Sequence, residues 1–248
     1  AFVYRDGLIG AMFFWAVWHD RPLCWACVRD SYGREFRPRQ LPSVSEFNRR
    51  TRSPRFAALL EAIYRVWAPR PQPGSACVLD ARPLVVGPCT KDANARPGRV
   101  YAGFARGYRL HALVDETGLV FAWKLTGLNT AEPDVALELL PQAPVGGTVR
   151  SDGVNDAARL YEAAEARTIT FLARPRKNAG KGHVPQVAAR LRGIARWNAA
   201  PEENARRRGA VERAFAWQSS FGGGLAPLPA WVRTPGRVQR WVAAKLTI

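Results

Sequence analysis

Two aspartates stand where predicted strands end, and together they could hold a divalent cation. Asp80 closes the apolar run over residues 77–80, and Asp152 closes the run over residues 147–152. Two carboxylates at one sheet edge repel each other unless a cation lies between them. Carboxylate oxygens are also the ligands that Mg²⁺ prefers. The sequence therefore predicts a cation site, provided that the two strands are neighbours.

The elements that must position these aspartates can be predicted from periodicity. Strand-like alternation runs over residues 77–80, 107–115 and 119–125, and residues 116–118 form a hairpin turn between the last two. A helix over 133–140, a strand over 147–152, a helix over 155–166 and a strand over 168–173 follow. A basic loop at 174–183 leads into further helix, including one over 202–217.

The predicted order β-β-β-α-β-α-β favours an α/β fold of the ribonuclease-H-like class, a mixed sheet flanked by helices. In this fold the first and fourth strands lie side by side. Asp80 and Asp152 are therefore expected at the same sheet edge.

An N-terminal helical region is expected over residues 1–67. Ser43 with Glu46 matches a capping box, and Ser53 with Pro54 precedes an apolar helical face over 56–64. Residues 68–74 contain three prolines and a glycine, which interrupt any helix or central strand. We expect a linker over 68–74 and one catalytic domain over 75–248, ending in basic C-terminal helices.

Composition limits the class of protein. The 248 residues carry 37 Lys and Arg against 20 Asp and Glu, a net charge of +17, and 47% are hydrophobic. This excludes wholesale disorder, and the charge favours a nucleic-acid partner. The longest apolar run, residues 8–18, is shorter than the roughly 20 residues of a membrane span. The chain begins at Ala1 and its only Met is Met12, so we expect that the natural start is missing.

Several ordered motifs resemble the DDE transposases of bacterial insertion sequences. Residues 79–84 resemble the segment around the family's first catalytic Asp, 107–111 its Gly-Tyr-Lys-Leu-His strand, and 151–153 its second-Asp segment. Residues 207–215 resemble the basic run leading into its catalytic Glu. Thr126, Asn129, Thr130 and Asp134 match the spacing after the third strand, and the resemblance extends from about Leu41 to the C-terminus.

The resemblance implies catalytic and metal-binding roles for Asp80, Asp152 and Glu212. Two Mg²⁺ or Mn²⁺ ions about 3.5 to 4 Å apart would neutralise the attacking and leaving oxygens of a phosphodiester. The implied activity is cleavage at the terminal inverted repeats of a mobile element and transfer of the 3′ ends to target DNA.

The same resemblance suggests partners and a location. The chain would act on double-stranded DNA as a homodimer assembled there, with the N-terminal region reading the transposon end and pairing two protomers. Four cysteines are too few for a disulfide scaffold at this length, so a reducing bacterial cytoplasm, at the nucleoid, is expected.

The sequence departs from the family pattern at three positions. Ala81 stands where the family commonly has Ser, and Ala205 and Ser219 stand where one branch has Tyr and Lys. The contacts of that Tyr and Lys therefore do not carry over. Two alternatives stay open: a catalytically decayed, basic DNA-binding remnant, and a ribonuclease-H-like endonuclease without strand transfer.

Basic residues concentrate between residues 174 and 208, where ten bases stand against Glu202 and Glu203. The ten are Arg174, Arg176, Lys177, Lys181, Arg190, Arg192, Arg196, Arg206, Arg207 and Arg208. Phosphate contact is the functional interpretation and a solvated surface is the alternative. The residues expected to bind DNA, including two from the strand at 107–115, are Arg109, His111, Arg174, Arg176, Lys177, Lys181, Arg206, Arg207 and Arg208.

Other residues that could do chemistry are expected to have structural roles. Cys24 and Cys27 form a CxxC that could bind zinc with Cys77 and Cys89, although buried free thiols are favoured. The competing acids are Asp92, Asp115, Asp134 and Asp156. Replacing Asp156 or Glu203 is expected to have little effect.

Overall fold

The chain divides into two compact units. The computed structural model describes residues 4–34, 37–68, 70–101, 103–176, 186–219, 224–225 and 227–248. Unit 1 consists of Ala1–Ala68, Cys89–Asn94 and Gln218–Ile248, and unit 2 of Pro69–Pro88 and Ala95–Trp217. The division between Ala68 and Pro69 falls inside the segment expected to be a linker.

Unit 1 is helical. Its α-helices are α1 (Asp6–Trp18), α2 (Val44–Thr51), α3 (Pro54–Trp67) and α9 (Pro235–Thr247), and two 3-10 turns are η1 (Trp25–Cys27) and η2 (Arg29–Ser31). The Ser43 hydroxyl accepts a hydrogen bond from the backbone N–H of Glu46, and the Ser53 hydroxyl accepts one from that of Phe56. Both caps satisfy backbone donors that a helix start leaves unpaired.

Helix α9 packs with the N-terminal helices α1 and α3. Its buried Lys245 forms an ion pair with Asp20, just after α1, with 2.9 Å between Nζ and Oδ1. Asp92 accepts a hydrogen bond of 2.7 Å from the backbone N–H of Thr234, just before α9. These contacts lie within unit 1, to which Gln218–Ile248 belongs. The sequence had suggested instead that residues 75–248 form one catalytic domain.

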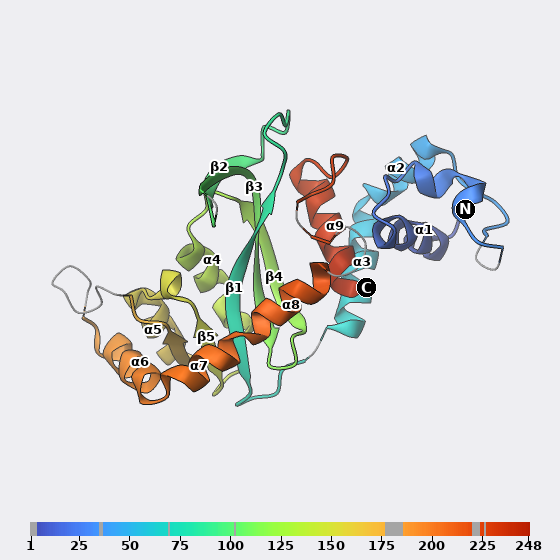
Figure 1. Ribbon diagram of the computed structural model, residues 1–248. Coiled ribbons are helices and arrows are strands. Elements are labelled where there is room, and N and C mark those ends of the chain that lie inside the picture. The colour runs from blue at the N-terminus through green and yellow to red at the C-terminus, as the bar shows by residue number, and fades with distance from the viewer. Residues whose placement is uncertain are drawn as a thin grey trace. The chain divides into compact units, whose positions relative to one another are not determined.

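Unit 2 is built on one mixed sheet (Figure 1). Its strands are β1 (Ala76–Val85), β2 (Arg96–Val100), β3 (Gly103–Asp115), β4 (Val120–Gly127), β5 (Thr148–Ser151) and β6 (Thr170–Ala173). The strand order is β2-β3-β1-β5-β6, and β4 also pairs with β3. Strands β1 and β5 are parallel neighbours, as the ribonuclease-H-like prediction requires.

Helices cover this sheet and bury its core. They are α4 (Glu132–Leu139), α5 (Ala158–Glu165), α6 (Ala188–Ala199), α7 (Pro201–Arg208) and α8 (Ala210–Ser219), with 3-10 turns η3 (Leu140–Gln142) and η4 (Gly153–Asn155). Leu79, Leu113, Val149, Leu160 and Phe171 are buried together in one cluster. The predicted fold class, a mixed α/β sheet flanked by helices, is confirmed.

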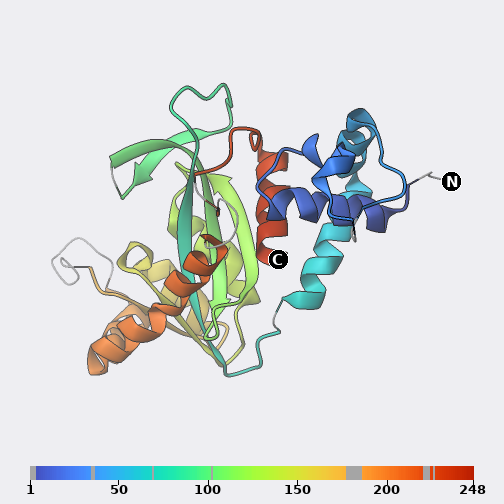
Figure 2. The same ribbon diagram turned by 45° about the vertical axis from the view of Figure 1, so that its right-hand side comes forward.

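Two elements differ from the sequence prediction. The single helix expected over 202–217 is two helices, α7 and α8, separated at Gly209, and glycine is a weak helix former. Strand β2 was not predicted. It pairs antiparallel with the start of β3, and the two form a hairpin that bends away from the rest of the sheet (Figure 2).

Among the described residues, no helix is both long and apolar enough to cross a membrane.

Candidate active site

Asp80 and Asp152 lie side by side at one edge of the sheet. Leu79 on β1 pairs with Ser151 on β5 in parallel register. Asp80 and Asp152 are the residues that directly follow this pair, on two strands about 4.8 Å apart. Asp152 itself lies just beyond the end of β5. The structure thus brings together the two aspartates that the strand order was expected to juxtapose.

The loop after Asp152 is held by a set of short hydrogen bonds. The Asp152 carboxylate accepts one of 3.1 Å from the backbone N–H of Val154. The Ser151 hydroxyl donates to the carbonyl of Leu79 at 2.8 Å, which ties β5 to β1. The Arg176 guanidinium donates to the carbonyls of Gly153 and Val154. Arg176 therefore fixes the loop, a role that differs from the DNA contact expected for it.

The electrostatics of this pair favour a cation. Burial, and after it the negative charge of Asp152, raise the pKa of Asp80 to about 7. A hydrogen bond from the Ala81 N–H and the positive charge of Arg208 act in the opposite direction. Near neutral pH Asp80 therefore holds a proton more readily than an ordinary aspartate, and a bound cation would compete with that proton.

Arg208 links Asp80 to Glu212. One guanidinium nitrogen lies 3.3 Å from Oδ2 of Asp80, and the other contacts Oε1 of Glu212, one helical turn farther along. Helix α7 is fixed beside β5 because the Arg150 guanidinium donates to the side-chain oxygen of Asn204 at 3.1 Å. This anchor, one turn before Arg208, sets where Arg208 and Glu212 lie.

The three carboxylates do not form one ligand group in this structure. Within the described ranges, no three or more His, Cys, Asp or Glu side chains are placed to hold a single ion. Glu212 is 65% exposed and turned toward Arg208, so it meets Asp80 only through the guanidinium. The structure therefore places Asp80 beside Asp152 and does not bring Glu212 into direct contact with either of them.

Sequence reasoning missed a fourth acid near this edge, Glu132 at the start of α4. Burial raises its pKa, and so does the charge of Asp152. Its carboxylate is 2.8 Å from the guanidinium of Arg109, and both side chains are largely buried. Arg109, which was expected to bind DNA, is therefore paired with Glu132. A buried arginine implies a carboxylate partner, but the sequence does not say which one.

His111 does not lie at the surface as a DNA-binding residue would. It is 2% exposed, and its Nε2 is 3.0 Å from the Thr126 hydroxyl. Burial lowers its pKa to about 3, with a smaller effect from the charges of Arg109 and Lys124. His111 is neutral and structural here, because both faces of β3 are covered at this position.

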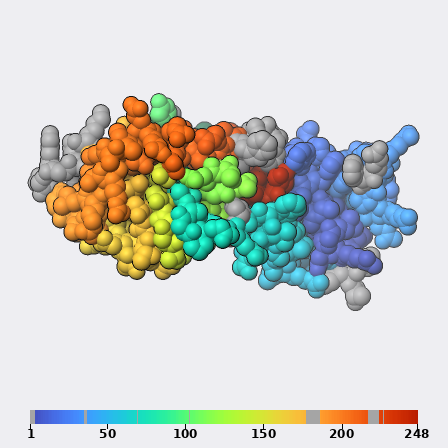
Figure 3. Space-filling view, turned by 90° about the horizontal axis from the view of Figure 1, so that it is seen from below, coloured from blue at the N-terminus to red at the C-terminus, as the bar shows by residue number. Residues whose placement is uncertain are grey.

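The remaining bases expected to bind DNA differ in how exposed they are and in whether they form ion pairs. Arg174 and Arg206 are exposed. Arg207 is half-exposed and pairs with Glu203 and Glu116. Lys177 and Lys181 lie outside the described residues. Helices α6 and α7, orange in Figure 3, form a continuous band on the surface of unit 2.

Arg190 and Asp156 form a fully buried ion pair. Arg190 was expected to belong to a basic DNA-contacting stretch, and replacing Asp156 was expected to have little effect. Two guanidinium nitrogens of Arg190 contact the two Asp156 oxygens at 2.8 and 2.7 Å, and neither side chain is exposed. The Tyr161 hydroxyl donates to the same carboxylate at 3.3 Å. Arg190 therefore cannot contribute to a basic surface, and Asp156 is not a neutral control position.

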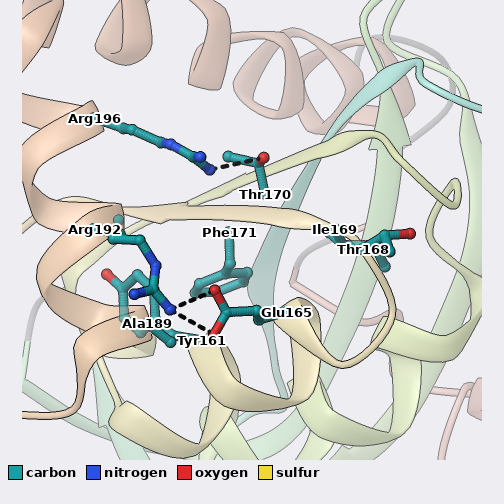
Figure 4. A pocket seen from close by; sticks show the side chains of 10 residues that line it. Tyr161, Glu165, Thr168, Ile169, Thr170, Phe171, Ala189, Arg192 and Arg196 are labelled. Carbon is teal, nitrogen blue, oxygen red and sulfur yellow. Dashed lines mark hydrogen bonds and ion pairs between the residues drawn. The ribbon is translucent and has the colours of Figure 1, made fainter.

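A hollow of about 310 Å³ lies among α5, β6 and α6 (Figure 4). Arg192 and Arg196 line it, but Arg192 pairs with Glu165 and Arg196 donates to the Thr170 hydroxyl. The charge of Arg192 is compensated by Glu165, whereas the Thr170 hydroxyl that Arg196 contacts is neutral. Gly193 lets α6 approach closely, because a Cβ there would lie 2.3 Å from the Tyr161 ring.

The other candidate acids and thiols have local roles. Asp115 accepts hydrogen bonds from its own turn, and Asp134 pairs with Arg159. The four cysteines are free: Cys77 is buried as favoured, whereas Cys24 and Cys89 are exposed. No zinc site forms among the described residues.

Comparison with known proteins decides the family. Residues 71–232, well over half of the chain, match the family described as Transposase DDE domain. The chain belongs to this family. DDE transposases generally use divalent metal ions, and the matched range contains Asp80, Asp152 and Glu212. No curated protein sequence matches the chain significantly.

A solved transposase structure has the same fold. The piggyBac transposase synaptic complex with hairpin DNA aligns with a TM-score of 0.53 at 10% identity, over 98% of this chain and 63% of that one. This chain therefore spans less than two thirds of that protein. The Mos1 strand transfer complex aligns with a TM-score of 0.27 at 11% identity, over 85% of this chain and 75% of that one. A score of 0.27 does not define a shared fold.

Proposed function

We propose that this DDE-family protein is a DNA transposase whose centre is the carboxylate pair Asp80 and Asp152. The observation that supports the proposal is the parallel register of β1 and β5, which places the two aspartates side by side. Burial and the neighbouring charge of Asp152 raise the pKa of Asp80. Adjacent carboxylates with this electrostatic cost are rare without a cation to neutralise them.

The residues present fit divalent cations. Asp80 and Asp152 offer hard oxygen ligands, and the Arg208 guanidinium beside Asp80 demonstrates that the site attracts positive charge. Two Mg²⁺ or Mn²⁺ ions would supply the neutralisation of the attacking and leaving oxygens in phosphodiester cleavage. Asp80 and Asp152 would hold them, and Glu212 would join once its side chain leaves Arg208.

The chain's own groups have defined parts in this proposal. Asp80 loses its proton as a cation replaces it. Arg208, released from Glu212, is positioned to contact a DNA phosphate at the same edge. The Arg176 and Val154 hydrogen bonds keep the Asp152 loop fixed, so the position of Asp152 is preorganised, whereas Glu212 has to move to join it.

The proposal also covers the DNA steps that the protein performs and the assembly in which it performs them. The protein would cleave at the terminal inverted repeats of its mobile element and transfer the 3′ ends to target DNA. It would act as a homodimer on double-stranded DNA at the nucleoid, with unit 1 helping to recognise the DNA end and to pair protomers.

A cleavage assay tests the proposal. The substrate is a duplex carrying the DNA that flanks this gene, incubated with Mg²⁺ and a supercoiled target plasmid. The wild type should nick the duplex to a 3′-hydroxyl and join that end to the plasmid. Asp80→Asn, Asp152→Asn and Glu212→Gln should each reduce nicking at least 100-fold while DNA binding persists.

Asp134→Asn is the matched control, because it makes the same chemical change in an exposed ion pair of unit 2. It should retain full nicking. Nicking without joining would indicate an endonuclease without strand transfer. Binding without nicking by the wild type would indicate a catalytically decayed remnant, and nicking that survives all three substitutions would place the centre elsewhere.

A further inference from the structure

The β2–β3 hairpin of unit 2 carries positive charge without any compensating acid in its own sequence. Residues 96–109 contain four arginines, Arg96, Arg99, Arg106 and Arg109, and no Asp or Glu. Arg109 pairs with Glu132. Within the described part of the chain, Arg99 and Arg106 have no carboxylate partner. The outer part of the hairpin is therefore a concentrated cationic surface.

Strand pairing assigns residues to the two faces of this hairpin. Arg99 pairs with Phe104 and Pro97 with Arg106, so these side chains share one face. Gly98 lies on the opposite face, where a Cβ would come within 2.5 Å of the Leu128 carbonyl oxygen. One face is therefore packed against the segment after β4, while the face with Arg99, Phe104 and Arg106 is free of that contact.

Two aromatic side chains are exposed on this hairpin. Phe104 is 83% exposed and Tyr101, in the turn, is fully exposed. Tyr108 lies on the same face of β3 four residues later and is 2% exposed. The hairpin thus extends beyond the packed core, and among the described residues its two aromatic rings are left largely uncovered. Apolar rings this exposed commonly mark a binding surface.

The combination of rings and arginines favours duplex DNA over an apolar partner. Arginines contact phosphates on either side of a groove, and exposed Phe or Tyr side chains can wedge against a base step in the minor groove. Two-stranded β-ribbons are among the elements that enter DNA grooves. An apolar protein partner would leave the two unpaired guanidinium groups desolvated without compensation.

We propose that the hairpin face, defined as Arg99, Tyr101, Phe104 and Arg106, binds the minor groove of the DNA at a distance from the cleavage position. Arg99 and Arg106 contact phosphates, and Phe104 and Tyr101 contact a base step. The proposal rests on the proposed function for the identity of the polymer. It adds a second contact region, separate from the carboxylates.

The geometry gives the spacing of this contact. Asp80 pairs with Ala112 on β3, and Phe104 is eight residues earlier in that strand. At about 3.4 Å per residue, Phe104 lies up to about 27 Å from the level of Asp80. With about 3.4 Å per base pair, the hairpin contacts DNA up to about eight base pairs from the cleaved phosphate.

The first experiment measures DNA binding without metal, using a mixed-sequence 40-base-pair duplex over a range of salt concentrations. Arg99→Gln with Arg106→Gln should reduce the slope of log affinity against log salt by about 1.8, since each lost phosphate contact removes about 0.9. The matched control is Arg159→Gln with Arg192→Gln, which removes the same charge from arginines already paired with Asp134 and Glu165. An unchanged slope in the hairpin variant, or an equal change in the control, overturns the proposal.

The second experiment tests the aromatic contact with 2-aminopurine placed at successive positions in the duplex that carries the DNA flanking this gene, where the bound register is fixed. The wild type should raise its fluorescence at one step, because a wedge unstacks the base. Phe104→Ala with Tyr101→Ala should abolish the rise, whereas Leu119→Ala, which truncates another exposed apolar side chain of unit 2, should leave it intact. Fluorescence unchanged by the wild type, or wild-type binding to anionic vesicles in preference to the duplex, contradicts the proposal.

The two proposals fail in different ways. Both experiments omit metal and use no cleavage readout, so a lack of nicking leaves the hairpin result standing. Metal-dependent nicking by a protein whose hairpin variants bind DNA like the wild type would refute the hairpin proposal alone.

Discussion

Asp80 lies beside Asp152 across the parallel strands β1 and β5, and after burial the charge of Asp152 is the largest cause raising the pKa of Asp80 to about 7. Arg208 only partly offsets this. The cation-free protein is therefore destabilised at the position where the proposed chemistry occurs. Functional sites often carry such a cost.

The first prediction concerns this cost. An acid whose pKa is higher in the folded than in the unfolded state stabilises folding below its unfolded pKa, near 3.8, and loses that contribution as pH rises through about 7. Without metal, Asp80→Asn should therefore be more stable than the wild type at pH 8, by about 2 to 4 kcal/mol. The difference should disappear near pH 4. Urea unfolding at both pH values measures it.

Added Mg²⁺ provides the control for this prediction. Because a ligand stabilises the state that binds it, Mg²⁺ at pH 8 should stabilise the wild type more than Asp80→Asn. Equal stability of the two proteins at pH 8 without metal would show that Asp80 carries no such cost.

A second prediction follows from buried His111. Its pKa is lowered from 6.5 to about 3, so its contribution to stability is present above pH 6.5 and is lost as pH falls toward 3. His111→Gln has no titrating ring. Between pH 7 and pH 4.5 it should lose about 2 kcal/mol less unfolding free energy than the wild type. Parallel losses in both proteins would mean that His111 titrates in the folded state as it does in water.

A third prediction concerns Arg208, whose guanidinium contacts both Asp80 and Glu212. Arg208→Gln removes a positive charge that competes with a metal ion, so Mn²⁺ affinity measured by calorimetry should rise several-fold. Arg206→Gln removes the same charge from an exposed neighbour on α7 and should change affinity little. Indistinguishable affinities in the two variants would contradict the competition.

A fourth prediction separates a buried ion pair from an exposed one. Asp156→Asn leaves Arg190 buried without its carboxylate, so it should cost about 3 to 5 kcal/mol of unfolding free energy. Asp134→Asn breaks the exposed pair with Arg159 and should cost no more than about 1 kcal/mol. Chemical denaturation of both variants measures the difference, and similar small losses would show that the Arg190 pair is not structural.

Local sequence patterns predicted the parts of the fold that depend on periodicity and caps. Ser43 and Ser53 begin helices as expected, because capping is decided within a few residues. The β1–β5 neighbourhood also followed from element order, and with it the pairing of Asp80 with Asp152. The proximity of Glu132 was not predictable in this way, since it depends on where α4 begins relative to the sheet.

Features decided by long-range pairing were missed or wrong. Residues 96–100 contain Pro, Gly and two Arg, which have low strand propensity, yet backbone pairing with β3 makes them β2. The basic stretch between 174 and 208 includes Arg190, which is buried against Asp156 and adds no charge to the surface. Charge composition alone does not reveal which arginines have internal partners.

The most direct measurement of the central claim is the position of a metal ion in crystals grown with Mn²⁺, located by its anomalous scattering. We expect an ion ligated directly by carboxylate oxygens of both Asp80 and Asp152, at about 2.0 to 2.6 Å from each. The ion should be absent from crystals of Asp80→Asn prepared in the same way. An ion bound elsewhere in the wild type, with none touching Asp80 and Asp152, would contradict the assignment of this carboxylate pair as the catalytic centre.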